Sequence, residues 1–341
     1  MRQRPVPGAD LALVRDRAEA PLRRLDGAHL LITGAAGLIG SWLLETLLDA
    51  RHHFGIEVSA TALVRDEATF RVRYPHLAAS SCITIQQGDV RNCAAPVRAP
   101  THIIHAASAD SPARNVEATD DVIDVIEAGT AHIVAIAQQV DAARVLLLSS
   151  GSVYSAQARP ISETDDTGNR GTSIAEQFGA AKRRAEQRAE ASSAVRGVTI
   201  ARIFTLFGPR LPINGQFAIG QFLGDALEGR PVLVHGDGTP IRSYLYLADL
   251  AAWCWHLLDR GGNVRAFNVG ASQQISIGDV ATRVGDLAGV RIIVETPPES
   301  GARPPCYLPA VERAQHELGL AAWTSLDDGL ARTWSWLRGG T

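Results

Sequence analysis

The stretch Leu30-Leu31-Ile32-Thr33-Gly34-Ala35-Ala36-Gly37-Leu38-Ile39-Gly40 decides the fold. Its apolar start predicts a buried strand, and three glycines at the spacing Gly-x-x-Gly-x-x-Gly lead into an amphipathic helix. Gly34 permits a tight turn, Gly37 lets the backbone approach a pyrophosphate, and Gly40 lets the helix pack closely on the strand. The helix N-terminus offers free N–H groups and a positive dipole end. The stretch therefore predicts a dinucleotide-binding turn.

On the C-terminal side of this turn, buried strands are expected to alternate with amphipathic helices. The predicted strands are Leu30–Thr33, Val58–Val64, Ile83–Gln86, His102–His105, Val145–Ser149 and Val198–Ile203. The predicted helices are Ser41–Ala50, Asp121–Val140 and Ser173–Ala191. The alternation is typical of an α/β fold, here a Rossmann-type doubly wound parallel sheet with helices on both faces.

The pattern of apolar runs along the chain predicts three regions. Residues 1–28 form an N-terminal helical extension, in which Leu11, Val14, Leu22 and Leu25 give one apolar stripe that packs on the main body. Residues 29–206 form the Rossmann domain. Residues 207–341 are mainly a smaller α/β substrate domain, with some segments that return to the Rossmann domain. Helices of the substrate domain are expected at Ala248–Leu258 and Ile277–Leu287.

Bulk composition excludes several classes of protein. The 341 residues carry a formal charge of −3 that is spread along the chain, which disfavours a nucleic-acid or membrane-surface partner. No apolar run approaches the length of a membrane span, and the first residues lack the apolar stretch of a signal peptide. Four scattered cysteines without metal-ligand spacing indicate free thiols, no metal site and a cytoplasmic location.

Several further motifs occur in an order that resembles a known family. They are Gly88-Asp89-Val90-Arg91, His105-Ala106-Ala107, Leu148-Ser149-Ser150-Gly151-Ser152-Val153-Tyr154 and the segment from Gly236 to Asp249. Together with Thr33 and the glycine turn, they resemble the extended short-chain dehydrogenase/reductases, and among these the NAD(P)-dependent nucleotide-sugar epimerase/dehydratase family. The resemblance runs from about residue 29 to the C-terminus.

The resemblance implies a tightly bound NAD or NADP. The residues expected to contact it are Gly34, Gly37, Leu38, Ile39, Arg65, Asp89, Val90, Ala106, Ala107, Lys182 and Phe204. The tip of the second strand leaves the choice between the two cofactors open. Arg65 suits a 2′-phosphate, whereas Asp66, one place later, is able to reach a ribose hydroxyl.

The resemblance also implies catalysis by Ser150 and by a Tyr-x-x-x-Lys pair on a helix. Here the lysine is Lys182, but Phe178 stands at the place of the tyrosine that would act as the base. Three explanations remain open for this departure. The phenylalanine was introduced to trap a substrate, or it is natural and Ser150, Tyr154 or a water handles the proton, or the protein binds its ligands without turnover.

A second departure narrows the reaction. Family 4,6-dehydratases carry an Asp-Glu pair directly after the catalytic Ser/Thr, whereas this chain has Gly151 and Ser152. Neither residue does carboxyl-type acid/base work, so epimerisation by transient oxidation of a sugar hydroxyl is favoured. A ketoreductase, an atypical dehydratase and a non-catalytic nucleotide-sugar-binding protein are the alternatives.

A nucleoside-diphosphate sugar is the partner that the resemblance implies, held in a cleft between the two domains. The residues expected to contact it are Ser108, Ser150, Ser152, Thr205, Gln216, Phe217, Arg242 and Arg303. Arg242 suits a diphosphate because a guanidinium binds phosphate oxygens in pairs. A homodimer through the helices Asp121–Val140 and Ser173–Ala191 is also expected.

Overall fold

The computed structural model describes residues 2–108, 119–155, 157–168, 173–192, 197–213, 217–260, 265–297, 299, 301 and 304–340. Two compact units make up the chain. Unit 1 comprises Met1–Tyr154, Asp166–Ile203 and Ala251–Phe267. Unit 2 comprises Ser155–Asp165, Phe204–Leu250 and Asn268–Thr341. The chain passes from one unit to the other several times.

A seven-stranded sheet in the order β11-β6-β5-β4-β1-β2-β3 forms the centre of unit 1. Every pairing from β6 to β3 is parallel. The strands are β1 (His29–Thr33), β2 (Ser59–Val64), β3 (Ile83–Gln87), β4 (His102–His105), β5 (Arg144–Ser150), β6 (Val198–Ile203) and β11 (Arg265–Val269). This strand order confirms the predicted Rossmann-type fold. From β1 the strands are added in one direction as far as β3, and then in the opposite direction from β4.

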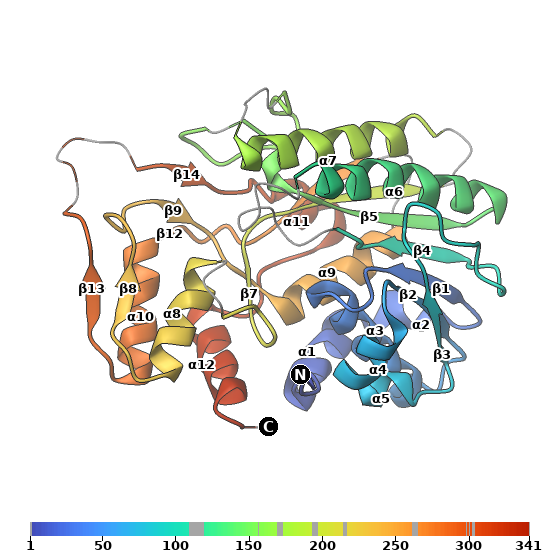
Figure 1. Cartoon of the computed structure of the whole chain (residues 1–341), viewed down its shortest axis with the longest axis horizontal. Coiled ribbons are helices and arrows are strands. Elements are labelled where there is room, and N and C mark those ends of the chain that lie inside the picture. The colour runs from blue at the N-terminus through green and yellow to red at the C-terminus, as the bar shows by residue number, and fades with distance from the viewer. Residues whose placement is uncertain are drawn as a thin grey trace. The chain divides into compact units, whose positions relative to one another are not determined.

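Helices cover both faces of this sheet, as Figure 1 shows. They are α3 (Leu38–Phe54), α4 (Glu67–Arg73), α5 (Pro75–Ala78), α6 (Thr119–Gln139), α7 (Ile174–Glu190) and α9 (Leu247–Arg260), of which α9 spans the two units. All five residues of β1 are buried, as a strand covered on both faces requires. At the start of α7, Ser173 and Glu176 form a reciprocal capping box, which fixes where that helix begins.

The N-terminal extension folds as two helices, α1 (Gly8–Arg17) and α2 (Glu19–Arg23), rather than as one helix with a single apolar stripe. The break has a simple cause: Pro21 has no N–H to donate to the carbonyl oxygen of Arg17. That oxygen instead accepts a hydrogen bond from His256 Nε2 at 2.8 Å. Val14 and Leu22 are fully buried, and both helices contact α3, so they pack within unit 1.

Unit 2 contains short strands in three small sheets, ordered β10-β7, β12-β9-β14 and β13-β8. Its strands are β7 (Leu206–Phe207), β8 (Val232–Val234), β9 (Ile241–Arg242), β10 (Leu245–Tyr246), β12 (Ile275–Ser276), β13 (Ile292–Val294) and β14 (Cys306–Tyr307). Its further helices are α8 (Ala218–Leu227), α10 (Ile277–Ala288), α11 (Glu312–Leu318) and α12 (Leu326–Leu337). Among the described residues, no helix is long and apolar enough to cross a membrane.

Candidate active site

The glycine turn connects β1 to α3. Gly34 has a φ of +63°, and a Cβ there would lie 2.6 Å from the carbonyl oxygen of Ala106. A Cβ on Gly40 would collide with the carbonyl oxygen of Gly34, so this glycine permits close packing within the turn. Gly37 is exposed, has an ordinary φ of −77°, and caps α3 without any side-chain hydrogen bond. The three glycines therefore serve different purposes.

A hydrogen-bonded chain of side chains fixes the backbone beside this turn. Thr33 Oγ1 accepts from the backbone N–H of Ala107 at 3.0 Å and lies 2.7 Å from His105 Nδ1. His105 Nε2 lies 3.1 Å from Thr130 Oγ1, whose own hydrogen goes to the carbonyl oxygen of Ile126. This arrangement requires the Nε2–H tautomer of His105. Burial, reinforced by the charge of Lys182, lowers the pKa of His105 to about 3, which keeps the ring neutral.

The start of α3 fits the diphosphate of a dinucleotide. Leu38 and Ile39 form the first helical turn, and no side chain caps their end of the helix. Such an end leaves backbone N–H groups for an anion and concentrates positive partial charge. The exposed Gly37 adds no side chain that would keep a phosphate away. Ala106 and Ala107 are small and partly exposed, so the neighbouring strand end is open as well.

Asp89 and Val90 follow β3, where contacts with the adenine are expected. Both carboxylate oxygens of Asp89 accept hydrogen bonds from Arg91, which lies 2.6–2.9 Å away. Arg91 also pairs with Asp121 and Asp124 of α6. The hydrogen bonds from Arg91 lower the pKa of Asp89. The pairs of Arg91 with Asp121 and Asp124 join this loop to α6. Val90 is buried and lies against α6.

The carboxyl end of β5 presents Ser150 and Ser152. Ser150 Oγ accepts from the Ser152 backbone N–H at 3.1 Å and from Ser152 Oγ at 2.9 Å. These bonds use the lone pairs of Ser150 Oγ, and no acceptor for its hydroxyl hydrogen occurs within the described part of the chain, so Ser150 is oriented as a donor. Gly151 is buried in the following short 3-10 helix, Gly151–Val153. The pair is suited to hold a substrate oxygen by donation rather than to accept a proton from it.

Phe178 and Lys182 lie one turn apart on α7. Lys182 is 7% exposed, and its Nζ donates to the carbonyl oxygen of Leu148 at 3.2 Å. Burial lowers the pKa of Lys182 to about 8, although the nearby carboxylate of Glu186 opposes the shift. Phe178 packs against the apolar cluster of α6 and α7 that includes Ile126. The structure therefore places the Lys182 ammonium against the Leu148 carbonyl near the end of β5, two residues before Ser150.

A buried carboxylate that the sequence analysis missed lies one turn beyond Lys182. Glu186 accepts from Ser149 Oγ at 2.5 Å and pairs with Arg202 at 2.8 Å. Arg202 also donates to the Tyr154 hydroxyl at 2.8 Å. The i, i+4 spacing of Lys182 and Glu186 was visible in the sequence and places both on one helix face. The pairing of Glu186 with Arg202 of β6 could not be predicted from the sequence.

The remaining predicted contact residues are distributed as follows. Ser108 is exposed after β4 in unit 1, next to residues outside the described part. In unit 2, Phe204 is buried with its ring centre 4.7 Å from that of Tyr307. The Arg242 guanidinium lies 5.7 Å from the centre of the same tyrosine ring. Thr205 is partly exposed and Phe217 is 40% exposed. Gln216 and Arg303 lie outside the described residues.

The strand order and the glycine turn define a Rossmann-type dinucleotide-binding protein. The sequence profile described as "NAD dependent epimerase/dehydratase family" matches residues 30–270. The chain belongs to this family, which confirms the predicted resemblance.

Relatives and solved structures agree with this assignment. The chain is 28% identical over 328 residues to UDP-glucuronic acid decarboxylase 1 of Xenopus tropicalis, covering 93% of this chain and 74% of the relative. It is 25% identical to MoeE5, solved in complex with UDP-glucuronic acid and NAD, with a TM-score of 0.73 over 91% of this chain and 99% of that chain. UDP-glucuronic acid 4-epimerase from Bacillus cereus shares the fold with a TM-score of 0.77 at 20% identity, over 91% and 99% of the two chains.

Proposed function

We propose that this protein is a nicotinamide-dinucleotide-dependent enzyme that modifies a nucleoside-diphosphate sugar, and that it does so as an epimerase. The observation that carries the proposal is the joint presence in unit 1 of an uncapped glycine turn and of Ser150 and Lys182 at the end of β5. The family membership supports the cofactor class. The relatives' names and bound ligands support a UDP-linked sugar as substrate.

The roles of the chain's own residues follow from their hydrogen bonds. A bound nicotinamide would supply the hydride acceptor. The first turn of α3 would bind the diphosphate at Gly37, Leu38 and Ile39. Ser150 would donate its free hydroxyl hydrogen to the reacting sugar oxygen, and Ser152 would hold Ser150 in that orientation. Lys182 would bind the ribose next to the reacting centre.

The missing tyrosine restricts where the sugar proton goes. Phe178 carries no ionisable group, and Tyr154 is 4% exposed with its hydroxyl bound to Arg202. That burial removes Tyr154 from the candidates, and Ser150 is oriented as a donor, which leaves a water as the proton carrier. Since Gly151 and Ser152 supply no carboxyl group, epimerisation is preferred over 4,6-dehydration.

Restoring the tyrosine tests the proposal directly. We expect Phe178→Tyr to raise turnover of a UDP-sugar by about 100-fold or more, since a positioned general base contributes about 10²–10⁴-fold. Product formation is followed by chromatography of the nucleotide sugars, with Phe178→Leu as the matched control that adds no hydroxyl. If neither the unaltered protein nor Phe178→Tyr converts any UDP-sugar, the protein binds its ligands without turnover and the enzyme proposal is wrong.

Two observations support a ketoreductase as the second candidate function. Ser150 is oriented as a donor, which suits a substrate carbonyl, and no carboxyl follows it. A ketoreductase would consume one equivalent of reduced nicotinamide for each product, whereas an epimerase leaves its absorbance at 340 nm unchanged over many turnovers. Measuring this absorbance during product formation separates the two.

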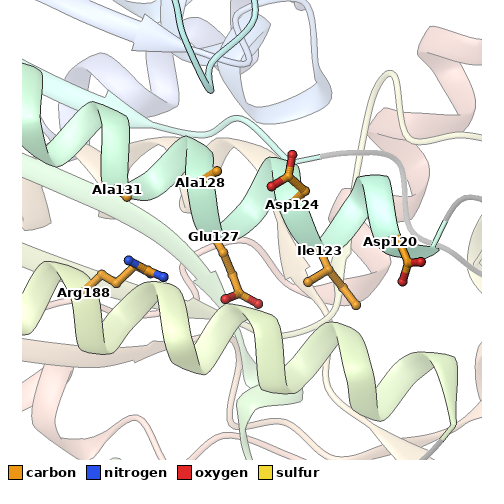
Figure 2. A pocket seen from close by; sticks show the side chains of 7 residues that line it. All are labelled: Asp120, Ile123, Asp124, Glu127, Ala128, Ala131 and Arg188. Carbon is orange, nitrogen blue, oxygen red and sulfur yellow. The ribbon is translucent and has the colours of Figure 1, made fainter.

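We also propose that the protein forms a homodimer through α6 and α7. These helices border an open groove of about 450 Å³, and Figure 2 shows Ile123 and Glu127 reaching from α6 toward α7. Two acidic residues, Asp120 and Asp124, line one end, and Arg188 lines the other. A two-fold-related copy would bring these opposite charges together. Light scattering should give twice the mass of the chain, and a monomeric mass would remove this proposal.

A cytoplasmic location also remains a proposal. The four cysteines, Cys82, Cys93, Cys254 and Cys306, are free in the structure, as expected in a reducing compartment. Fractionation of the producing cells tests it.

A further inference from the structure

Arg65 directly follows β2. It lies between the loop after β1 and the loop after β3, both of which are expected to contact the adenosine. The carbonyl oxygen of Leu63 accepts from the Ala35 N–H in the glycine turn, at 3.4 Å. The carbonyl oxygen of Val64 accepts from the Gly88 N–H, directly before Asp89, at 2.9 Å. These two bonds fix the tip of β2 between the ends of β1 and β3. In Rossmann folds, the side chains at this tip read the 2′ position of the adenosine ribose.

The carboxylate next to this tip has a structural task. Asp66 is the N-cap of α4: its Oδ1 accepts from the Thr69 backbone N–H at 2.9 Å, and its Oδ2 accepts from Thr69 Oγ1 at 2.6 Å. Both oxygens are thereby turned toward the helix. The same bonds lower the pKa of Asp66, so the cap is ionised and stable at neutral pH. A carboxylate that reads a ribose hydroxyl must direct an oxygen toward the ribose, and the two cap bonds hold both oxygens of Asp66 toward Thr69 instead.

The other two carboxylates around the tip are also paired. Glu67 binds Arg71 at 2.7 Å, and Asp89 binds Arg91 at 2.6 Å. Arg65 itself is exposed, and no ion pair of its guanidinium occurs within the described part of the chain. Its charge also contributes to the lowered pKa of Asp89, after the stronger effects of Arg91.

We propose that Arg65 selects NADP(H) over NAD(H) by binding the 2′-phosphate of the adenosine ribose. The proposal rests on the dinucleotide-binding function proposed above and names the ligand of that same site. A guanidinium presents paired donors to phosphate oxygens, and here it is the one basic group at the tip of β2 that no carboxylate occupies within the described residues. The protein would then use a different cofactor from the NAD in the name of its family.

Binding measurements on nucleotide-free protein test this without any turnover. NAD⁺ and NADP⁺ are titrated by calorimetry, and 5′-ADP and 2′,5′-ADP are titrated as fragments that lack the nicotinamide. We expect the 2′-phosphorylated member of each pair to bind at least about 10-fold more tightly, since a charge-assisted hydrogen bond changes affinity by about 10- to 100-fold. Arg65→Ala should remove that preference and change the affinity for NAD⁺ by less than about threefold.

The matched control is Arg71→Ala, which removes an equal charge from the neighbouring helix and should preserve the preference for NADP⁺. Asp66→Asn tests the rival reader of the ribose: it should weaken α4 and leave the affinity for NAD⁺ unchanged. Three results would overturn the proposal, namely equal or tighter binding of NAD⁺, a parallel loss of both ligands in Arg65→Ala, or a selective loss of NAD⁺ in Asp66→Asn. If no dinucleotide binds at all, the proposed function itself fails.

Discussion

The ammonium nitrogen of Lys182 lies 5.7 Å from the centre of the Phe178 ring, one turn earlier on α7. The lysine thus lies beside a side chain that has no proton to exchange. A buried ammonium beside an aromatic face gains some cation–π stabilisation but loses most of its hydration. The result is a lysine whose charge is poorly supported in the absence of ligand.

This arrangement predicts a pH-dependent stability. Burial lowers the pKa of Lys182 from 10.5 to about 8, so between these two pH values the unfolded chain holds a proton that the folded chain has lost. The free energy of unfolding therefore rises with pH across that interval, by up to about 3 kcal/mol from this one group. We expect urea denaturation of nucleotide-free protein to show this rise relative to Lys182→Met. A constant difference between the two proteins would mean that Lys182 is hydrated.

The buried ion pair of Glu186 and Arg202 makes a second prediction. Glu186→Gln leaves the Arg202 guanidinium buried without a full counter-charge, so the free energy of unfolding should fall by about 3 kcal/mol. Glu190→Gln is the matched control on the same helix, because Glu190 is 33% exposed and pairs with Arg183 only at the surface. It should cost less than about 1 kcal/mol. Equal losses in the two variants would contradict a buried role for Glu186.

Substitutions in the glycine turn should affect stability at Gly34 and dinucleotide binding at Gly37. Gly34→Ala should destabilise the fold because it combines a φ of +63° with a collision against Ala106. Gly55→Ala is its control: φ is +65° there, but no atom lies within 4 Å of the added Cβ. We expect thermal unfolding to show the larger loss for Gly34→Ala. Gly37→Ala should cost less stability than Gly34→Ala, since its φ is ordinary and the added Cβ would lie 3.1 Å from the Gly34 carbonyl oxygen, yet weaken dinucleotide binding about tenfold or more.

Ser150 and Ser152 should affect turnover unequally. Ser150→Ala removes the donor to the reacting oxygen, so kcat should fall by about 10²-fold, measured in the Phe178→Tyr background. Ser152→Ala removes only one of the two bonds that orient Ser150, so its effect on kcat should be about tenfold. A fall in kcat that is larger for Ser152→Ala would show that Ser152, rather than Ser150, faces the substrate.

The sequence by itself determined the fold class, the glycine turn, the family and most element bounds. β4 and β6 begin and end where the apolar runs predict, and α3 starts at Leu38 because the turn residues themselves form its first turn. These features depend on neighbours a few residues apart, which periodicity and glycine spacing record. The division into domains and the roles of the site residues stay predictions.

Only the tertiary structure decided how the side chains of different elements share their hydrogen bonds. It bound Tyr154 to Arg202, gave Ser149 to Glu186, and paired Arg91 with Asp124 of α6. Residue types at their spacings do not reveal such assignments, because each polar group has several partners within reach and burial selects among them. The glycine turn thus predicted a dinucleotide site, and the bonds made by Asp66, Glu67 and Asp89 support the proposal that Arg65 reads the 2′ position of its ribose.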